Sequence, residues 1–177
     1  MLGWDRRLER WVVDHRVGVL DPVAKGLSYA GGHSALWLVL AVVVAAYLRR
    51  PRVLVATLAA AVLAELASDA LKAATGRDRP DVPRLVALPH SSSFPSGHAT
   101  TSFACATVLG AALPRWRVPL YLLAALVAWS RAYVGVHYPL DVAAGAFLGV
   151  AVGLLVLRAP RMLAAARRSR SRATRTG

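Results

Sequence analysis

The chain has 177 residues, of which 56% are hydrophobic and 18% charged, and its formal net charge is +13. This length suits one domain, and the high apolar content, which comes in blocks, favours membrane spans over a soluble globule. A nucleic-acid-binding protein can be this basic, but here the basic residues gather between apolar blocks and in the C-terminal tail, as in membrane proteins. The single cysteine, Cys105, excludes a disulfide framework within one chain.

Residues 1–32 predict an amphipathic helix that lies in the membrane interface. Charged residues interrupt the segment, while Trp4, Leu8, Trp11 and Val12 recur at helical spacing on one face. The segment lacks the uncharged apolar run of a signal peptide.

Five apolar segments follow the N-terminal region and predict membrane spans. They cover about 33–48, 53–74, 97–113, 118–134 and 139–157. A bilayer core is crossed by about 20 helical residues, and no segment alternates like a strand, so a helical bundle is the spanning solution. We therefore predict an all-α integral membrane bundle of about five transmembrane helices over residues 33–158. Gly145, Gly149 and Gly153 predict a closely packed face in the last span.

The distribution of arginine predicts how the bundle is oriented. With five spans, one side carries twelve basic and no acidic residues, in the segments 49–52 and 115–117 and in the tail from residue 158. The positive-inside rule places this side in the cytoplasm. Residues 159–177 are thus expected to form a disordered, basic cytoplasmic tail.

Three polar clusters interrupt the apolar sequence and carry the functional signal. They are KAATGRDRP at 72–80, PSGH at 95–98 and SRAYVGVHYPLD at 130–141. Polar residues at membrane depth or at helix ends are costly, so a concentrated set of them indicates a functional site. Five spans bring all three clusters to the outer or periplasmic face.

The cationic residues of these clusters fit a phosphoryl group. Lys72, Arg79 and Arg131 would bind phosphate oxygens, Lys72 as a point charge and the arginines as planar forks. The alternative is structural pairing, and for Lys72 the partner would be Asp69, three residues earlier on the same helix face.

Ser96 and Gly97 open the third span. Exposed N–H groups at a helix N-terminus bind anions, serine is a favoured cap, and glycine allows close backbone approach. We predict contacts between these residues and the phosphate, with a simple helix start as the alternative.

Two histidines complete the inventory. His137 and Asp141 are four residues apart where the fifth span begins, a spacing that lets the carboxylate orient the imidazole if the helix starts early enough. Spacing alone leaves open whether His98 or His137 attacks the phosphorus. The alternatives are structural interface histidines or a metal site, although the many arginines nearby would repel a cation.

The three motifs together resemble the type 2 phosphatidic acid phosphatase and vanadium haloperoxidase superfamily. They read Lys-x6-Arg-Pro, Pro-Ser-Gly-His and Ser-Arg-x5-His-x3-Asp, within roughly residues 30–158. The resemblance implies metal-independent hydrolysis without a cofactor. It implies that His137 is the nucleophile that forms a phosphohistidine, that Asp141 orients it, and that His98 is the general acid.

We therefore predict a membrane lipid phosphatase of the undecaprenyl-diphosphatase-like branch, acting on undecaprenyl diphosphate at the outer face. Phosphatidylglycerol phosphate, phosphatidic acid and a polyprenyl-phosphoryl sugar phosphate are alternative substrates. Lipid phosphotransfer, vanadate-dependent haloperoxidase activity and a non-catalytic lipid carrier are the rival functions. The expected partners are the lipid phosphate and the membrane, with no nucleic acid, and the sequence assigns no oligomeric state.

Overall fold

The computed structural model describes residues 3–173, except for the side chains of residues 33 and 160–173. Within this part of the chain every regular element is helical and no strand occurs, which confirms the all-α prediction. The helices are α1 (Gly3–Asp14), α2 (Asp21–Ala30), α3 (Ala35–Leu48), α4 (Pro51–Thr75), α5 (Gly97–Ala112), α6 (Arg117–Tyr133) and α7 (Pro139–Ala173), with short 3-10 turns η1 (Gly18–Leu20), η2 (Gly32–Ser34) and η3 (Pro114–Trp116).

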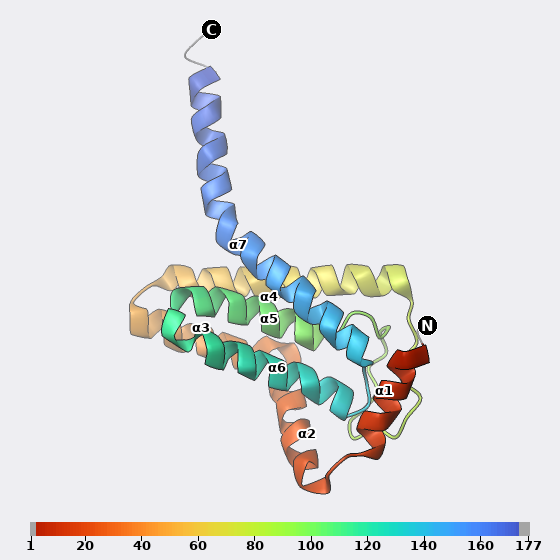
Figure 1. Ribbon diagram of the computed structural model, residues 1–177. Coiled ribbons are helices and arrows are strands. Elements are labelled where there is room, and N and C mark those ends of the chain that lie inside the picture. Colours follow the sequence, from red (N-terminus) through yellow and green to blue (C-terminus); the bar gives the residue numbers. More distant parts are fainter. Residues whose placement is uncertain (1–2, 174–177) are drawn as a thin grey trace.

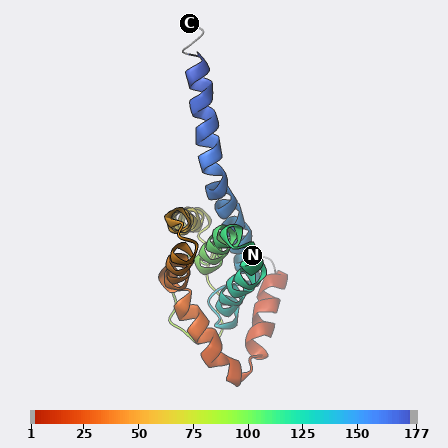
Figure 2. The same ribbon diagram turned by 90° about the vertical axis from the view of Figure 1, so that its left-hand side faces the viewer.

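Helix α5 is the centre of the bundle. Figures 1 and 2 show α3 and α4 on one side of it and α6 and α7 on the other. It is buried almost throughout, and its small residues, among them Ala104 and the free Cys105, allow neighbouring helices to pack closely. The buried Trp37 of α3 donates its indole N–H to Ser102 Oγ at 2.9 Å, so even the outer helix is tied to the centre.

The closest approach in the bundle is between α5 and α7. A Cβ atom added at Gly145 would lie 2.6 Å from Ser96 O, and one at Gly149 would lie 2.2 Å from Thr100 O. At Gly153 it would lie 2.6 Å from a side-chain carbon of Thr107. The glycine face predicted from the sequence therefore packs directly on the backbone of α5.

Two helices are long and apolar enough to cross a membrane, namely α4 and the Pro139–Ala159 part of α7. The pair Gly18–Ala30 and Ala35–Leu48, bent by 67°, would be a third span if it crosses as one unit. Helices α3, α5 and α6 have 14, 16 and 17 residues, short of the roughly 20 residues that cross a bilayer core. The described residues thus form a helical bundle with two to three candidate spans.

Helix α1 faces the bundle with its acidic side. Asp5, Glu9 and Val13 are buried, whereas Trp4 and Trp11 are 46% and 57% exposed. The helix lies beside the start of α7 and the loop that leads from α4 to α5 (Figure 1). The aromatic residues predicted to form its apolar face therefore point away from the protein.

Helix α7 corrects the expectation of a disordered tail. It continues as a helix to Ala173 and leaves the bundle in its second half (Figure 1). Residues 161–173 are mostly alanine, arginine, leucine and methionine, and these residue types have high intrinsic helix propensity. The prediction of a disordered tail considered the charge of these residues and not their helix propensity.

We expect Gly149→Ala to reduce the free energy of unfolding by roughly 1–3 kcal/mol, because the added methyl group overpacks the contact with Thr100 O. Thermal unfolding in detergent measures the change. Gly26→Ala is the matched control, since nothing lies within 4 Å of a Cβ there, and it should be neutral or slightly stabilising. Equal stability of the two variants would contradict the close packing of α7 on α5.

Candidate active site

The three polar clusters converge on one cavity of about 140 Å³ at the ends of α4, α5 and α6. Six of the eight residues predicted from the sequence line it, namely Lys72, Arg79, Gly97, His98, Arg131 and His137. The other two, Ser96 and Asp141, are buried without lining the cavity. Segments far apart in the sequence thus place cations and imidazoles around a single space.

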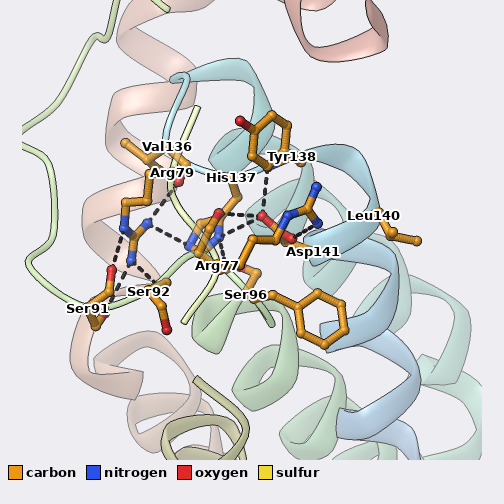
Figure 3. Close-up of polar contacts among 12 residues, drawn as sticks. Arg77, Arg79, Ser91, Ser92, Ser96, Val136, His137, Tyr138, Leu140 and Asp141 are labelled. Atoms are coloured by element: carbon orange, nitrogen blue, oxygen red, sulfur yellow. Dashed lines mark hydrogen bonds and ion pairs between the residues drawn. The ribbon is translucent and has the colours of Figure 1, made fainter. Parts of the chain in front are cut away.

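The hydrogen bonds of His137 define which ring nitrogen carries the proton. Nδ1 lies 2.7 Å from the carbonyl oxygen of Ser93, which can only accept, so Nδ1 is assigned the proton. Nε2 then keeps its lone pair and accepts a hydrogen bond from Arg79 Nη1 at 3.2 Å. Figure 3 shows the imidazole between Arg79 and Asp141. The nitrogen available for attack is therefore Nε2.

The electrostatics of the site keep His137 uncharged. The pKa of its imidazole is lowered to about 4, chiefly by burial and with a contribution from the charges of Arg79 and Arg131, while the Asp141 carboxylate opposes the shift. A group with a depressed pKa stays deprotonated until the pH falls through that value. At neutral pH the ring is a neutral imidazole, which is the nucleophilic form.

Asp141 is buried in the first turn of α7 and is surrounded by donors. It accepts a hydrogen bond from Arg77 Nη1 at 2.5 Å, from Ser93 Oγ at 2.5 Å and from the Tyr138 N–H at 2.9 Å. Its Oδ2 lies 3.7 Å from His137 Nδ1, which is longer than a hydrogen bond. Ser93 links the two, because its carbonyl holds the imidazole and its hydroxyl holds the carboxylate.

The reason for this indirect link is where α7 starts. The helix begins at Pro139, so His137 lies in the loop before it. The spacing of four residues would place the side chains on one face only if both were helical. Asp141 is still behind the imidazole, but Ser93 makes the direct contact.

All five N–H groups of Arg79 have acceptors. Nε donates to Ser91 O at 2.8 Å, and Nη1 donates to Val136 O at 2.8 Å as well as to His137 Nε2. Nη2 donates to Ser91 Oγ at 3.2 Å and to Ser92 O at 3.3 Å. Burial lowers the pKa of the guanidinium and the Asp141 charge opposes that shift. The acceptors on Ser91, Ser92 and Val136 thus hold the guanidinium beside Nε2 of the imidazole.

Lys72 lines the cavity and also pairs with Asp69, at 3.0 Å between Nζ and Oδ1. A Cβ added at Gly97 would lie 3.3 Å from Lys72 Nζ, so the ammonium group sits close over the first turn of α5. Glycine leaves the room for this approach. Ser96 donates its N–H to Asp141 O at 3.0 Å, while its buried hydroxyl has no hydrogen-bond partner within the described residues.

Ser28 of α2 holds two of the predicted residues at once. Its hydroxyl accepts a hydrogen bond from Arg131 Nη1, and its carbonyl oxygen lies 3.1 Å from His98 Nε2. Arg131 is 5% exposed, and its Nε has no hydrogen-bond partner in the part of the chain that is described. The N-terminal region therefore contributes directly to the wall of the site.

Four residues that the sequence analysis did not assign complete this arrangement, namely Asp5, Ser28, Arg77 and Ser93. Arg77 lies inside the first cluster and Ser93 in a run of three serines, so a local signal existed for both. Asp5 and Ser28 stand in segments interpreted as interfacial, with nothing nearby that points to the site. Among the described residues, no group of three or more His, Cys, Asp or Glu could hold a metal ion.

Comparison with known proteins gives one consistent family. A family model described as the PAP2 superfamily matches residues 53–164. The decaprenylphosphoryl-5-phosphoribose phosphatase of Mycobacterium tuberculosis is 42% identical over 147 residues, which make up 80% of this chain and 80% of that protein. The undecaprenyl-diphosphatase of Sulfolobus acidocaldarius is 46% identical over 68 residues, 38% of this chain and 33% of that protein.

Solved structures agree with these sequence relatives. LpxE of Aquifex aeolicus has a TM-score of 0.77 and 30% identity and covers 89% of this chain and 96% of its own. The transmembrane PAP2-type phosphatidylglycerolphosphate phosphatase of Bacillus subtilis has a TM-score of 0.73 and 28% identity and covers 89% of this chain and 85% of its own. A bacterial vanadium-dependent iodoperoxidase, with a TM-score of 0.75 and 18% identity, shares the fold.

We expect His137 to titrate at a pKa of about 4, well below the ordinary value of 6.5, because its imidazole is buried. NMR of the protein with 15N-labelled histidine measures this, and the His137→Ala spectrum identifies the resonances. At neutral pH the shifts should show a proton on Nδ1 and none on Nε2. Titration at 6.5 or above, or a proton on Nε2, would contradict the assigned hydrogen bonds.

Proposed function

The chain belongs to the PAP2 superfamily, and on that premise we propose that this membrane lipid phosphatase removes the terminal phosphate from a polyprenyl-phosphoryl sugar phosphate. The mycobacterial phosphatase that matches most of both chains is named for such a lipid. The proposal replaces the preference for undecaprenyl diphosphate, since the relative of that name matches little more than a third of this chain. It was one of the alternatives that the sequence left open.

The observation that carries this choice is Glu65. Its side chain lines the same cavity as Lys72 and accepts a hydrogen bond from Thr101 Oγ1 at 3.3 Å. Glu65 precedes Lys72 by two turns of α4, which places it about 10 Å deeper along the helix axis. The cavity therefore combines a cationic part around Lys72 with a part that carries the Glu65 carboxylate.

A carboxylate in this position discriminates between substrates. It repels the second phosphate of a diphosphate, and it accepts hydrogen bonds from hydroxyl groups. In a diphosphate the second phosphate follows the first directly, whereas in a polyprenyl-phosphoryl sugar phosphate the hydroxyl-bearing sugar separates the terminal phosphate from the phosphodiester that joins the sugar to the lipid. With the phosphate at Lys72 and the lipid in the bilayer, the sugar would lie at the depth of Glu65.

The mechanism we propose uses the neutral imidazole of His137. Nε2 attacks the phosphorus, a P–N bond forms, and the P–O bond to the sugar breaks. His98, protonated once the negative phosphate is bound, gives this proton to the departing sugar oxygen, and it takes one back from the water that then cleaves the phosphohistidine. As Nε2 turns to the phosphorus, the Arg79 N–H that it held is released toward a phosphoryl oxygen.

The remaining phosphate contacts follow the sequence prediction. Lys72, Arg79 and Arg131 neutralise the phosphoryl oxygens, and Gly97 offers its N–H at the start of α5. Ser96, predicted to share that role, does not line the cavity and gives its N–H to the Asp141 carbonyl. Asp141 orients His137 through Ser93. No metal or other cofactor takes part in this reaction.

We further propose that the chain crosses the membrane five times. Residues 1–32 lie at the interface, residues 33–158 form the transmembrane phosphatase, and residues 159–177 form a basic cytoplasmic tail. The exposed tryptophans of α1 support the first assignment, because indole rings favour the membrane interface. The active site then faces the periplasm or the outside.

Phosphate release from a lipid panel in detergent tests the substrate. We expect decaprenylphosphoryl-5-phosphoribose to be hydrolysed at least about tenfold faster than undecaprenyl diphosphate, since a site that bonds a substrate hydroxyl discriminates strongly. Glu65→Gln removes the negative charge, so the rate on the diphosphate should rise relative to the sugar phosphate. His137→Ala should abolish release from both lipids.

Two variants serve as controls for that experiment. Asp14→Asn neutralises an exposed carboxylate of α1, and His90→Ala removes an exposed loop histidine, and neither should change the ranking. Faster phosphate release from the diphosphate than from the sugar phosphate by the wild type would contradict the sugar-phosphate proposal. An unchanged ranking in Glu65→Gln would remove Glu65 from substrate recognition.

The orientation is tested in cells. A reporter that works only in the cytoplasm should be active when it is fused after Gly177, because the side with the excess of arginine is expected to be cytoplasmic. A cysteine at position 90, in a Cys105→Ala background, should react with a membrane-impermeant maleimide added from outside. A periplasmic C-terminal reporter would reverse the proposed topology.

A further inference from the structure

Helix α1 carries a buried carboxylate, Asp5, that lies behind Asp141 on the side away from the cavity. Asp5 and Asp141 are both fully buried, and Arg77 lies between them. Arg77 Nη1 is 2.5 Å from Asp141 Oδ1, and its Nη2 is 2.6 Å from Asp5 Oδ2. Figure 3 shows the Arg77 end of this chain, with the guanidinium beside Asp141 and Tyr138. One guanidinium therefore serves two carboxylates.

The second oxygen of Asp5 holds the start of α7. Asp5 Oδ1 accepts the Leu140 N–H at 3.0 Å, and Leu140 is the second residue of that helix. The first N–H groups of a helix have no partner within the helix, so an outside acceptor stabilises this end. Asp5 thus fixes both the guanidinium behind Asp141 and the backbone three residues after His137.

The arrangement confines Arg77 on every side. Its guanidinium carbon is 4.3 Å from the centroid of the Tyr138 ring, and its side chain is only 12% exposed. A planar guanidinium can bridge two carboxylates, whereas an ammonium group offers no such fork. Neither Asp5 nor Arg77 lines the cavity that holds His137. Their effect on the reaction must therefore be indirect, through Asp141 and Ser93 and, for Asp5, also through the first turn of α7.

We propose that Asp5 and Arg77 are positioning residues of the phosphatase, so that α1 helps to position the catalytic residues. The chain of contacts runs from Asp5 to Arg77, to Asp141, to Ser93 and to the imidazole of His137. This proposal depends on the proposed role of His137 and is independent of which lipid is the substrate.

Steady-state kinetics on the full-length protein test it, with phosphate release measured from the lipid that the wild type hydrolyses fastest. We expect Asp5→Asn to lower kcat about tenfold and Arg77→Gln about a hundredfold, within the range that misplacement of catalytic groups causes. KM should stay within about twofold, because neither residue touches the substrate. Asp5→Glu should recover part of the loss.

The double variant and the pH profile separate positioning from general damage. If Asp5 acts through Arg77, the double variant should be no slower than Arg77→Gln alone. Arg77→Gln also leaves the Asp141 carboxylate without its cation, which favours protonated His137, so the acid limb of kcat/KM should move to higher pH. A merely structural loss would reduce the amount of active enzyme without moving that limb.

Matched variants decide each outcome. Asp14→Asn changes the same residue type on the exposed side of α1 and should behave as the wild type. If Asp5→Asn does not fold, Arg77→Lys, which keeps the charge but loses the fork, takes its place, and normal kcat would then overturn the proposal. Normal kcat in a folded Asp5→Asn would overturn it as well. If His137→Ala remains active, the proposed mechanism fails instead, and the two failures are thus distinguishable.

Discussion

The backbones of α5 and α7 approach closely because Gly145, Gly149 and Gly153 have no side chains, and the end of the bundle that holds the cavity depends on that approach. Where both helices begin, the Ser96 N–H donates to the Asp141 carbonyl at 3.0 Å, so the first turns of both helices lie side by side. Two helix N-termini then bring their positive ends to the same region. His137, two residues before α7, and Gly97, the first residue of α5, come to line one cavity for this reason. The close packing of α5 and α7 therefore also brings together residues that line the cavity.

Helix α1 inverts the usual amphipathic arrangement. Its acidic residues turn inward and its tryptophans outward, which suits a helix with protein on one side and an apolar medium on the other. The inward acids do not add up to a repulsive cluster. Asp5 is paired with Arg77, and burial raises the pKa of Glu9 to about 8, an effect that Arg16 opposes, so Glu9 is mostly protonated at neutral pH. Arg16 in turn donates to Tyr133 O at 2.7 Å and to Pro83 O at 2.8 Å, which fastens the segment after α1 to the end of α6.

Much of this site could be predicted from the sequence, because its residues stand out against an apolar background. Five of the predicted residues are conspicuous as polar residues in apolar surroundings, and they line one cavity, namely Lys72, Arg79, His98, Arg131 and His137. The indirect link between Asp141 and His137 could not be predicted, since it depends on the residue at which α7 begins and on Ser93 of a distant loop. Asp5 and Ser28 could not be assigned to the site from the sequence for a different reason. Their local pattern is that of an interfacial helix, and only tertiary packing shows that they face inward. The roles assigned to the site residues stay predictions.

The hydrogen bonds of the resting site distinguish the two arginines that line it. Arg79 has an acceptor for each of its N–H groups, one of them His137 Nε2, so it can bind a phosphoryl oxygen only by exchanging a bond that it already makes. Arg131 and Ser96 instead have buried polar atoms without a partner among the described residues, and a buried unpaired donor is costly. In the proposed reaction a phosphate would therefore gain most from Arg131 on arrival, because Arg131 lines the cavity and Ser96 does not. Arg79 would contribute when Nε2 leaves it for the phosphorus, which is when negative charge on the equatorial oxygens most needs a donor. An interaction that becomes available only along the reaction path stabilises the transition state more than the bound substrate, and so raises kcat more than it lowers KM.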